Sequence, residues 1–432
     1  MTRSTTTADR SSVVPAPAET TMRLPLPPDL VERGRCPFDP PVALERMREQ
    51  APVSPVTMLS GATIWMVTGY DEARTVLSDP RFSADRLRGG SILRDIPDDV
   101  REKMFDERSR AGSFISMDPP EHSRYRKLLT GQFTVRRMRQ LAPRISEIVT
   151  EHIDAMVAAG TSADLVTAFA LPVPSLVICE LLGVPYAERS EFQERTATML
   201  RLDTPFEELM RVRDGMRAFM LRLVTEKRDQ PTDDLLSGLI HGDADPALND
   251  DELVGIATLL LIAGHETTAN MFGLGIFALL EHPEQLDALR ADRTLIDGAV
   301  EELLRYLSIV HIGLARLTVE PVELGGKEIP ADATVMISLP VTNRDPGHWD
   351  DPASLELARP RGTHLAFGHG VHQCLGQQLA RVEMTVGFTE LLRRLPGLRL
   401  TIAPEEVPLR SNMVVYGVHA LPVAWDAPEV RR

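Results

Sequence analysis

The sequence predicts a mainly helical fold with small β-sheets, which places it in the α+β class. Most windows between residues 136 and 310 carry the 3.6-residue apolar period of helices, broken by capped turns. A strand-rich stretch follows at about 317–340, and alternating apolar residues precede the helices at about 60–75. With 432 residues and a hydrophobic content of 43%, the chain can bury a sizeable core.

The N-terminal part is predicted to be a tail followed by a short strand. Residues 1–22 are rich in Thr, Ser, Ala and Pro and lack the apolar run of a signal peptide, so we expect a disordered tail. Residues 23–432 contain no repeat and no long Gly/Ser or Pro linker, so we expect them to form a single domain. The alternation around Ile64, Met66 and Thr68 predicts a short strand near an N-terminal sheet.

The longest predicted helix can be bounded from its two ends. Asn249 is a good N-cap, Glu252 stands three residues later in capping-box position, and Pro283 stops the helix. The roughly 33 residues between them would span about 50 Å, enough to cross a domain. Because the stretch 259–262 reads Leu-Leu-Leu-Ile, this helix is expected to be buried.

The composition of the middle of that helix, residues 263–268, is unfavourable for helix stability. It places a glycine, a carboxylate and two β-branched hydroxyl residues inside a core helix. A local break of these rules in an otherwise consistent helix indicates a functional site. Further along, Gly325 and Gly326 predict a turn, and residues 335–339 read as a buried strand.

Charge and cysteine usage exclude several classes of protein. A net charge of −15 argues against a general binder of nucleic acid or of anionic membranes, and no segment approaches the roughly 20 apolar residues of a membrane span. Three scattered cysteines cannot form a disulfide framework, so we expect a reducing cytoplasm as the compartment. We also expect a monomer. Cys179 lies in an apolar stretch and is predicted to fill the core, and Cys36 is predicted to be structural.

The third cysteine, Cys374, lies in the strongest functional signal, the glycine-rich stretch 367–376. Glycines let the backbone approach a flat ligand closely, and a predicted helix start at Leu375 would favour a thiolate. Three interpretations compete. A structural cysteine does not explain the glycines, and a zinc site from His369, His372 and Cys374 lacks a fourth ligand with the usual spacing. Ligation of a haem iron by the thiolate is therefore favoured.

Three motifs carry a resemblance to a known family. Phe367-x-x-Gly370-x-x-x-Cys374-x-Gly376, Ala263-Gly264-x-Glu266-Thr267-Thr268 and Glu302-x-x-Arg305 occur in one chain. They resemble, in order and spacing, the haem-binding loop, the oxygen-activating helix and the ion pair of the cytochrome P450 superfamily. The stretches 169–174 and 182–186 further resemble its actinobacterial branch, which hydroxylates vitamin D, statins, macrolides and xenobiotics. The resemblance covers residues 23–432 and implies a haem b buried between the long central helix and the cysteine loop.

The resemblance also implies a role for each matched residue. Cys374 would be the axial ligand that donates electron density to the haem iron, in a loop shared with Phe367, Gly368 and Gly376. Gly264 would let the helix open a groove for O₂, and Glu266 with Thr267 would relay protons to it. The alternative for Thr267 is a hydroxyl bonded to the preceding helical turn.

The haem propionates would be held by basic side chains. His122 and Arg126 stand four residues apart, on one face of a helix, where both can meet a propionate. Arg316 and His372 match the remaining propionate contacts of the family. A surface salt bridge is the alternative for Arg126.

Glu302 and Arg305 stand three residues apart on a helix and are predicted to pair in support of the fold. In much of the family a third basic residue joins them from the segment that here reads Pro352-Ala353-Ser354-Leu355. Ser354 departs from that pattern. Arg359 is a candidate substitute, which leaves the triad open at this stage.

The predicted function is a monooxygenase that uses O₂, two electrons and two protons to oxidise an apolar small molecule. Electrons are expected from a separate ferredoxin and ferredoxin reductase, because the chain contains no credible flavin, nicotinamide or iron–sulfur motif. Two basic clusters, at 124–127 and 136–139, are the predicted docking site. A peroxide-driven peroxygenase and a haem gas sensor or carrier are the alternatives. The predicted substrate pocket is apolar and includes Leu260, Ile309, Val310, Ile312, Val414 and Val415.

Overall fold

The computed structural model describes residues 26–34, 36–59, 61–85, 106–242, 246–312 and 314–427. The predicted tail at 1–22 lies outside these ranges. Helices dominate the described chain, as the apolar periodicity predicts. The helices are α1 Val42–Gln50, α2 Tyr70–Ser78, α4 Glu107–Arg110, α5 Glu121–Thr130, α6 Val135–Ala159, α7 Pro172–Leu182, α8 Arg189–Leu200, α9 Phe206–Asp229, α10 Leu235–Ile240, α11 Asp250–Glu281, α12 Pro283–Ala291, α13 Ile296–Leu307, α14 Leu339–Thr342 and α15 Gln377–Arg394.

The strands form three small sheets. They are β1 Val53–Thr57, β2 Thr63–Val67, β3 Phe82–Ser83, β4 Ser162–Asp164, β5 Ala315–Thr318, β6 Val322–Leu324, β7 Lys327–Ile329, β8 Thr334–Ile337, β9 Arg399–Leu400 and β10 Pro422–Ala424. The largest sheet has the order β1-β2-β8-β5-β3, with β2 and β8 parallel and the other pairs antiparallel. It joins the strand predicted around Ile64 to the strand-rich stretch near residue 335, so these two predictions are confirmed.

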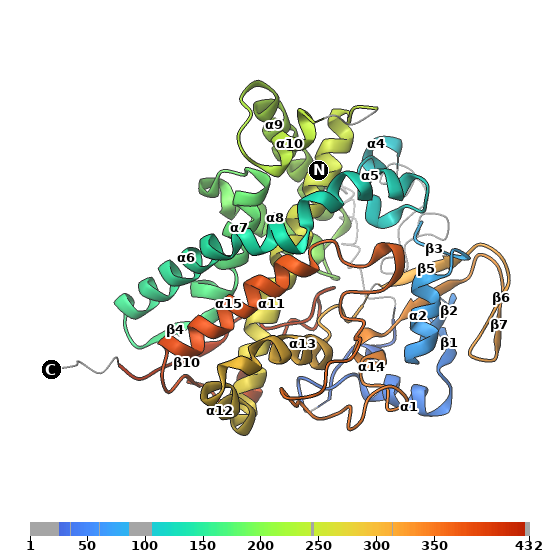
Figure 1. The fold of residues 1–432 in the computed structure, drawn as a ribbon. Helices are drawn as coiled ribbons and strands as arrows, with labels where there is room; N and C mark the ends of the chain where they lie inside the picture. Colours follow the sequence, from blue (N-terminus) through green and yellow to red (C-terminus); the bar gives the residue numbers. More distant parts are fainter. Residues whose placement is uncertain are drawn as a thin grey trace, which may run out of the picture.

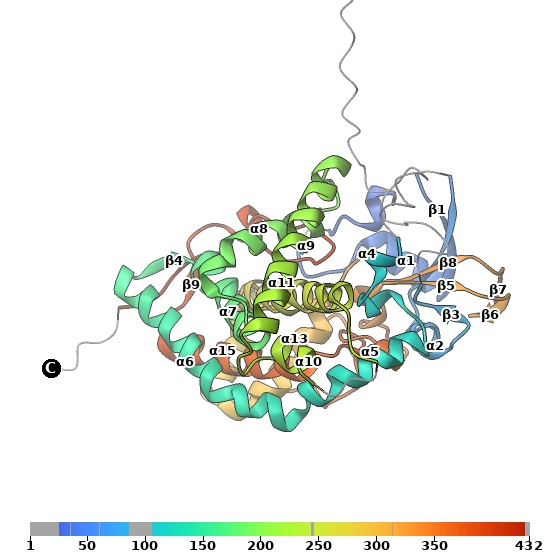
Figure 2. The same cartoon turned by 90° about the horizontal axis from the view of Figure 1, so that it is seen from above.

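The long helices α6, α7 and α15 and the largest sheet lie on opposite sides of the molecule (Figures 1 and 2). Figures 1 and 2 both show α6, α7 and α15 on one side and β1, β2, β5 and β3 on the other, with α11 between them. The main hydrophobic cluster lies among the helices and includes Cys179, which is buried as predicted. Two smaller clusters flank the sheet and pack α1 and α2 against it.

Helix α11 is the central element and has the ends that the sequence predicts. Asn249 accepts a hydrogen bond from the Glu252 backbone N–H at 2.9 Å, and Glu252 accepts one from the Asn249 N–H at 2.8 Å, which completes a capping box. The helix ends at Glu281, and Pro283 opens α12 two residues later. Contacts with α7, α9, α13 and α15 bury most of its length. No helix among the described residues is long and apolar enough to cross a membrane.

Candidate active site

The cysteine loop is held in shape by its own backbone. The Cys374 N–H donates to the Phe367 carbonyl at 2.8 Å, and the Gly368 N–H donates to the Leu365 carbonyl at 2.8 Å. Gly368 and Gly370 have φ angles of +69° and +71°, a region that favours glycine. A Cβ atom on Gly370 would also collide with the carbonyl of Leu77 at the end of α2. Glycine is therefore required at position 370 for both conformation and space.

Cys374 lies between this loop and α15. The prediction of a helix start at Leu375 is wrong by two residues, because Gly376 is the N-cap and α15 begins at Gln377. Desolvation raises the pKa of the Cys374 thiol, while the backbone N–H groups of Gly376 and Gln377 and the positive charges of Arg126 and Arg381 oppose the rise. A metal cation bound to the sulfur would further favour the thiolate form.

The turn of α11 around Ala263 interrupts the burial of that helix. Ala263 is exposed, and Gly264 and Thr267 are partly exposed, whereas residues 268–279 of the following turns are buried throughout. A Cβ atom on Gly264 would lie 2.7 Å from Ile178 Cδ1 of α7, so this glycine permits close packing of two helices. That packing is a reason for Gly264 which the sequence did not reveal, and its oxygen groove stays a prediction.

Thr267 and Glu266 make the polar contacts of this turn. The Thr267 hydroxyl donates to the Ala263 carbonyl at 2.8 Å, which is the back-bonded geometry named as its alternative role. The Glu266 carboxylate is buried and lies 3.0 Å from Nη2 of Arg410, a residue near the end of the chain. Asn270 Nδ2 also donates to it at 3.5 Å. Arg410 was missed by sequence reasoning, because one chain does not reveal which distant cation meets a buried carboxylate.

A second polar group contains the residues predicted to hold propionates. The rings of His122 and His372 lie 4.1 Å apart between centroids, although α5 and the cysteine loop are far apart in sequence. Burial and the nearby charges of Arg126 and Arg316 lower the pKa of His122. Burial and Arg316 lower the pKa of His372 to about 3. The structure thus brings together four basic side chains that the sequence placed in one group.

The hydrogen-bonding capacity of this group fits an anionic ligand. Both ring nitrogens of His122 and Nε2 of His372 are buried and have no hydrogen-bond partner among the described residues. Buried polar atoms normally find partners, so unpaired ring nitrogens next to two arginines suit carboxylates such as haem propionates. The Arg126 Nη2 group also donates to the Gln373 carbonyl at 2.6 Å, and the Arg316 Nη1 group to the Ala315 carbonyl at 2.9 Å. Arg126 is therefore half-buried against the cysteine loop, and it forms no salt bridge with any residue that the structure describes.

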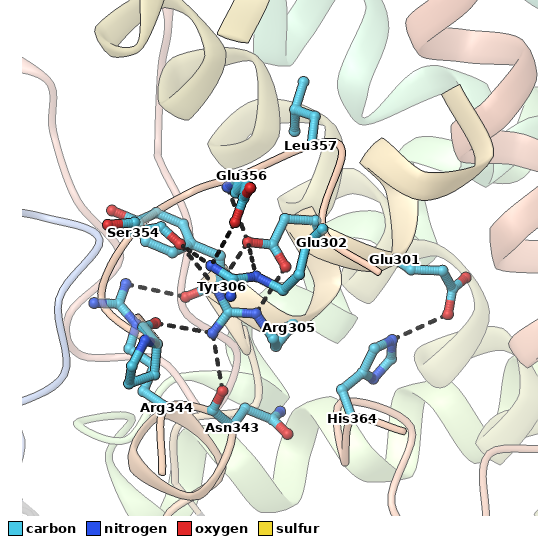
Figure 3. A network of polar contacts seen from close by, with 12 residues as sticks. Glu301, Glu302, Arg305, Tyr306, Asn343, Arg344, Ser354, Glu356, Leu357 and His364 are labelled. Atoms are coloured by element: carbon cyan, nitrogen blue, oxygen red, sulfur yellow. Dashed lines mark hydrogen bonds and ion pairs between the residues drawn. The ribbon is translucent and has the colours of Figure 1, made fainter. Parts of the chain in front are cut away.

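Glu302 and Arg305 form the predicted buried pair, and Arg359 completes it. Arg305 contacts both carboxylate oxygens of Glu302 at 2.7 and 2.8 Å (Figure 3). Arg359 Nε lies 3.1 Å from Glu302 Oε1. Ser354 takes part through its backbone carbonyl, which accepts from Arg305 at 3.0 Å. Arg359 therefore supplies the third basic group from five residues beyond the expected position.

The predicted pocket residues divide into two groups. Val310 and Val414 are partly exposed, whereas the remaining ones are buried. Ile309 and Val415 belong to the main helical core, and Ile312 belongs to a cluster beside the sheet. The buried members are Leu260, Ile309, Ile312 and Val415. Among the described residues, no group of three or more His, Cys, Asp or Glu side chains is placed to hold a metal ion.

Comparisons with known proteins agree with this geometry. Residues 57–411 match the family model described as cytochrome P450. Cytochrome P450 105C1 of a Streptomyces species is 48% identical over 388 residues, which cover 90% of this chain and 96% of the relative. The crystal structure of Rif16 is 57% identical with a TM-score of 0.80, and covers 93% of this chain and 100% of that chain. CYP105P1 in complex with filipin I is 42% identical with a TM-score of 0.86, over 94% and 100% of the two chains.

Family match, overall fold and the surroundings of Cys374 lead to one assignment. The matched segment spans both the turn of α11 around Ala263 and the cysteine loop. The same matched segment also contains the buried Glu302–Arg305 pair. The chain belongs to the cytochrome P450 family, in the branch of bacterial hydroxylases.

Proposed function

We propose that the enzyme inserts one oxygen atom into a bulky, weakly polar small molecule, by hydroxylation or epoxidation. We further propose that a separate ferredoxin and ferredoxin reductase supply the electrons. The observation that carries the proposal is the exposed turn of α11 at Ala263, with partly exposed apolar side chains, Val310 and Val414, as its candidate lining. An apolar pocket with few polar groups suits a ligand of low polarity. The relative CYP105P1, whose crystal structure contains filipin I, supports the same substrate class.

As a P450 monooxygenase, the protein uses haem b and takes O₂ as co-substrate. Haem b, when bound, supplies the redox chemistry that cleaves O₂. In our proposal the Cys374 sulfur holds the cofactor on one side, and His122, His372, Arg126 and Arg316 bind its carboxylates. The overall reaction combines substrate, O₂, two electrons and two protons, and gives oxidised product and one water.

Two side chains of α11 are proposed to move the protons. Thr267 Oγ1 can turn from the Ala263 carbonyl toward the exposed side of the helix and pass on a proton there. Glu266 Oε2 would resupply that proton from the interior, after its contact with Arg410 loosens. Leu260, Val310 and Val414 would exclude water from the substrate side and so protect the reaction from wasteful proton leakage.

The proposal is tested with holoenzyme, ¹⁸O₂, NADPH, a plant-type ferredoxin and its reductase. Candidate substrates are first screened for the spectral shift that follows displacement of water from the iron, starting with filipin I and other apolar macrolides. We expect at least one of them to yield product that contains a single ¹⁸O atom.

The alternatives give different results in the same assay. Product from unlabelled H₂O₂ under anaerobic conditions, with none from ¹⁸O₂ and electrons, would establish a peroxygenase. Binding and reduction without product from any compound would favour a gas sensor or carrier and would contradict the proposal. Spectral shifts with small polar compounds alone would overturn the proposed substrate class.

A further inference from the structure

Three further polar side chains form a cluster that contacts the cysteine loop and is separate from the Glu302–Arg305 pair. It consists of Glu301 of α13, His364 before the cysteine loop and Arg381 of α15. Arg381 donates to both carboxylate oxygens of Glu301, from Nε at 2.6 Å and from Nη2 at 3.0 Å. The His364 Nε2 atom lies 3.1 Å from Glu301 Oε2, and Figure 3 shows this contact pointing away from the Glu302–Arg305 pair.

His364 is held by two contacts. The Ala366 backbone N–H lies 3.2 Å from His364 Nδ1, so Nε2 is the ring nitrogen that faces Glu301. His364 therefore fixes the orientation of the carboxylate. Glu301 and Arg381 bring one carboxylate and one guanidinium to the cluster.

Arg381 connects this cluster to the loop that contains Cys374. Its guanidinium carbon lies 4.6 Å from the centroid of the Phe367 ring, a distance typical of a cation–π contact. The carbonyl of Phe367 accepts the Cys374 N–H at 2.8 Å. The guanidinium thus stacks on the residue that anchors the backbone of Cys374, and Glu301 holds it there by two hydrogen bonds.

We propose that Glu301, His364 and Arg381 form a positioning cluster that sets the electrostatic field at Cys374 and so adjusts how readily the haem iron is reduced. Partners beyond the ligand commonly tune a metal centre through charge and hydrogen bonding. A positive charge near the sulfur stabilises its negative charge, weakens its donation to iron and favours the reduced state. A negative charge does the opposite. In the parent protein the charge of Glu301 opposes that of Arg381. The inference rests on the proposed binding of the haem by Cys374, and not on the proposed substrate or electron donor.

The test measures the reduction midpoint of each holoenzyme variant by optical titration with a chemical reductant. Arg381→Gln leaves Glu301 uncompensated and should lower the equilibrium constant for reduction by about threefold or more. Glu301→Gln leaves Arg381 uncompensated and should raise it by a similar factor. For a one-electron couple about threefold corresponds to roughly 28 mV, because tenfold is 59 mV. The double variant should return close to the parent value.

Matched variants separate charge from folding. Arg393→Gln removes an arginine from the same helix α15 that pairs with Glu390 at 2.5 Å, near the end farthest from Cys374, and should leave the midpoint unchanged. His364→Leu keeps both charges and should shift the equilibrium constant by less than about twofold. The carbon monoxide spectrum of each variant confirms that the thiolate ligand is retained.

The outcomes are distinct. Shifts of the same sign in Glu301→Gln and Arg381→Gln, or no shift in either with an intact carbon monoxide spectrum, would overturn the proposal and leave the cluster a structural brace. If Arg381→Gln does not retain haem, Glu301→Gln and Arg381→Lys decide, because Lys keeps the charge. A raised equilibrium constant in the first and a parent-like value in the second support the proposal, and any other pair of values contradicts it.

Discussion

Glu266 is a buried carboxylate whose charge is matched by Arg410 from the end of the chain. A buried ion pair of this kind is costly to break by removing one partner, since the other charge is left unpaired. In the state described here the carboxylate faces Arg410 and Asn270, so delivery of a proton toward Thr267 requires that it change partners. The local polarity of α11 therefore serves both the fold and the proposed chemistry.

At the residue scale we predict that Thr267→Ala uncouples electron consumption from product formation. The variant loses the hydroxyl but keeps the Ala263 turn, so haem and substrate binding should be retained while peroxide is released in place of product. Glu266→Gln should slow turnover by about 10²–10⁴-fold, the usual range for general acid–base groups. The check is NADPH consumed, peroxide formed and product formed per turnover. Unchanged coupling in both variants would leave these residues only a structural role.

The buried ring of His311 gives a prediction for pH. Burial and the charge of Arg33 lower its pKa to about 3, although a hydrogen bond between Nε2 and the Met413 carbonyl opposes the shift. Unfolding therefore takes up a proton between pH 6.5 and about 3, and the stability present above pH 6.5 is lost as the pH falls through this range. The contribution is up to about 1.4 kcal/mol per pH unit.

Urea denaturation of the parent and His311→Gln at pH 7, 6 and 5 measures this contribution. Gln keeps a donor for the Met413 carbonyl and does not titrate, so its stability should fall less steeply with decreasing pH. If the free energy of unfolding falls equally with decreasing pH in both proteins, His311 is not the group that takes up the proton.

At the scale of elements, patterns with local causes were predictable and pairings over long distances were not. The capping box fixed the start of α11, and paired glycines fixed the turn between β6 and β7, where Gly325 and Gly326 have φ angles of +55° and +70°. The start of α15 was placed two residues early, because nothing in the local sequence distinguishes Leu375 in a turn from Leu375 in a helix. Arg410 finds Glu266 through the tertiary fold, which one chain does not encode in its spacing. The sequence offered Arg359 as a candidate partner of Glu302, and the tertiary fold decides for it.

The contact between α7 and α11 yields a prediction for Gly264. Gly264→Ala gains about 1 kcal/mol of helix propensity, but its Cβ would press on Ile178 Cδ1 at 2.7 Å. Overpacking of this kind costs about 1–3 kcal/mol, so we expect a net loss of stability. Ile178→Ala removes both colliding atoms, Cδ1 at 2.7 Å and Cγ1 at 2.8 Å, so the double variant should be more stable than the sum of the two single changes. Urea denaturation of all four proteins gives this coupling, and strict additivity would contradict the contact.

At the scale of the whole molecule, an acidic enzyme presents a local basic surface close to the cysteine loop. Arg124 pairs with Glu252, and Arg126 donates to the Gln373 carbonyl. These two residues of the predicted docking clusters therefore make contacts within the protein and are less available to a partner. The exposed remainder, here called the basic surface, lies on α5 and at the start of α6. It consists of Lys127, Arg136, Arg137 and Arg139.

We predict that the basic surface binds ferredoxin. Charge reversal of Lys127 and Arg137 to Glu should slow reduction by ferredoxin by about tenfold or more at low salt and leave substrate binding intact. Lys327→Glu on the hairpin of β6 and β7 is the matched control, because Lys327 is exposed and lies on the sheet side of the molecule (Figure 1). Stopped-flow reduction over a series of salt concentrations measures the effect. Equal rates in parent and reversed protein at low salt would place the docking site elsewhere.

The close packing of Gly370 on the Leu77 carbonyl has a consequence for how the chain folds. The cysteine loop packs against Leu77 of α2 and accepts a hydrogen bond from Arg126 of α5. Both helices belong to the first third of the chain, whereas the loop belongs to the last sixth. Contacts between such distant segments form only after long stretches of chain have been brought together, and they are slow to form for that reason. These contacts can form only after the last sixth of the chain has been synthesised, so α2 and α5 cannot complete the surroundings of Cys374 before that point.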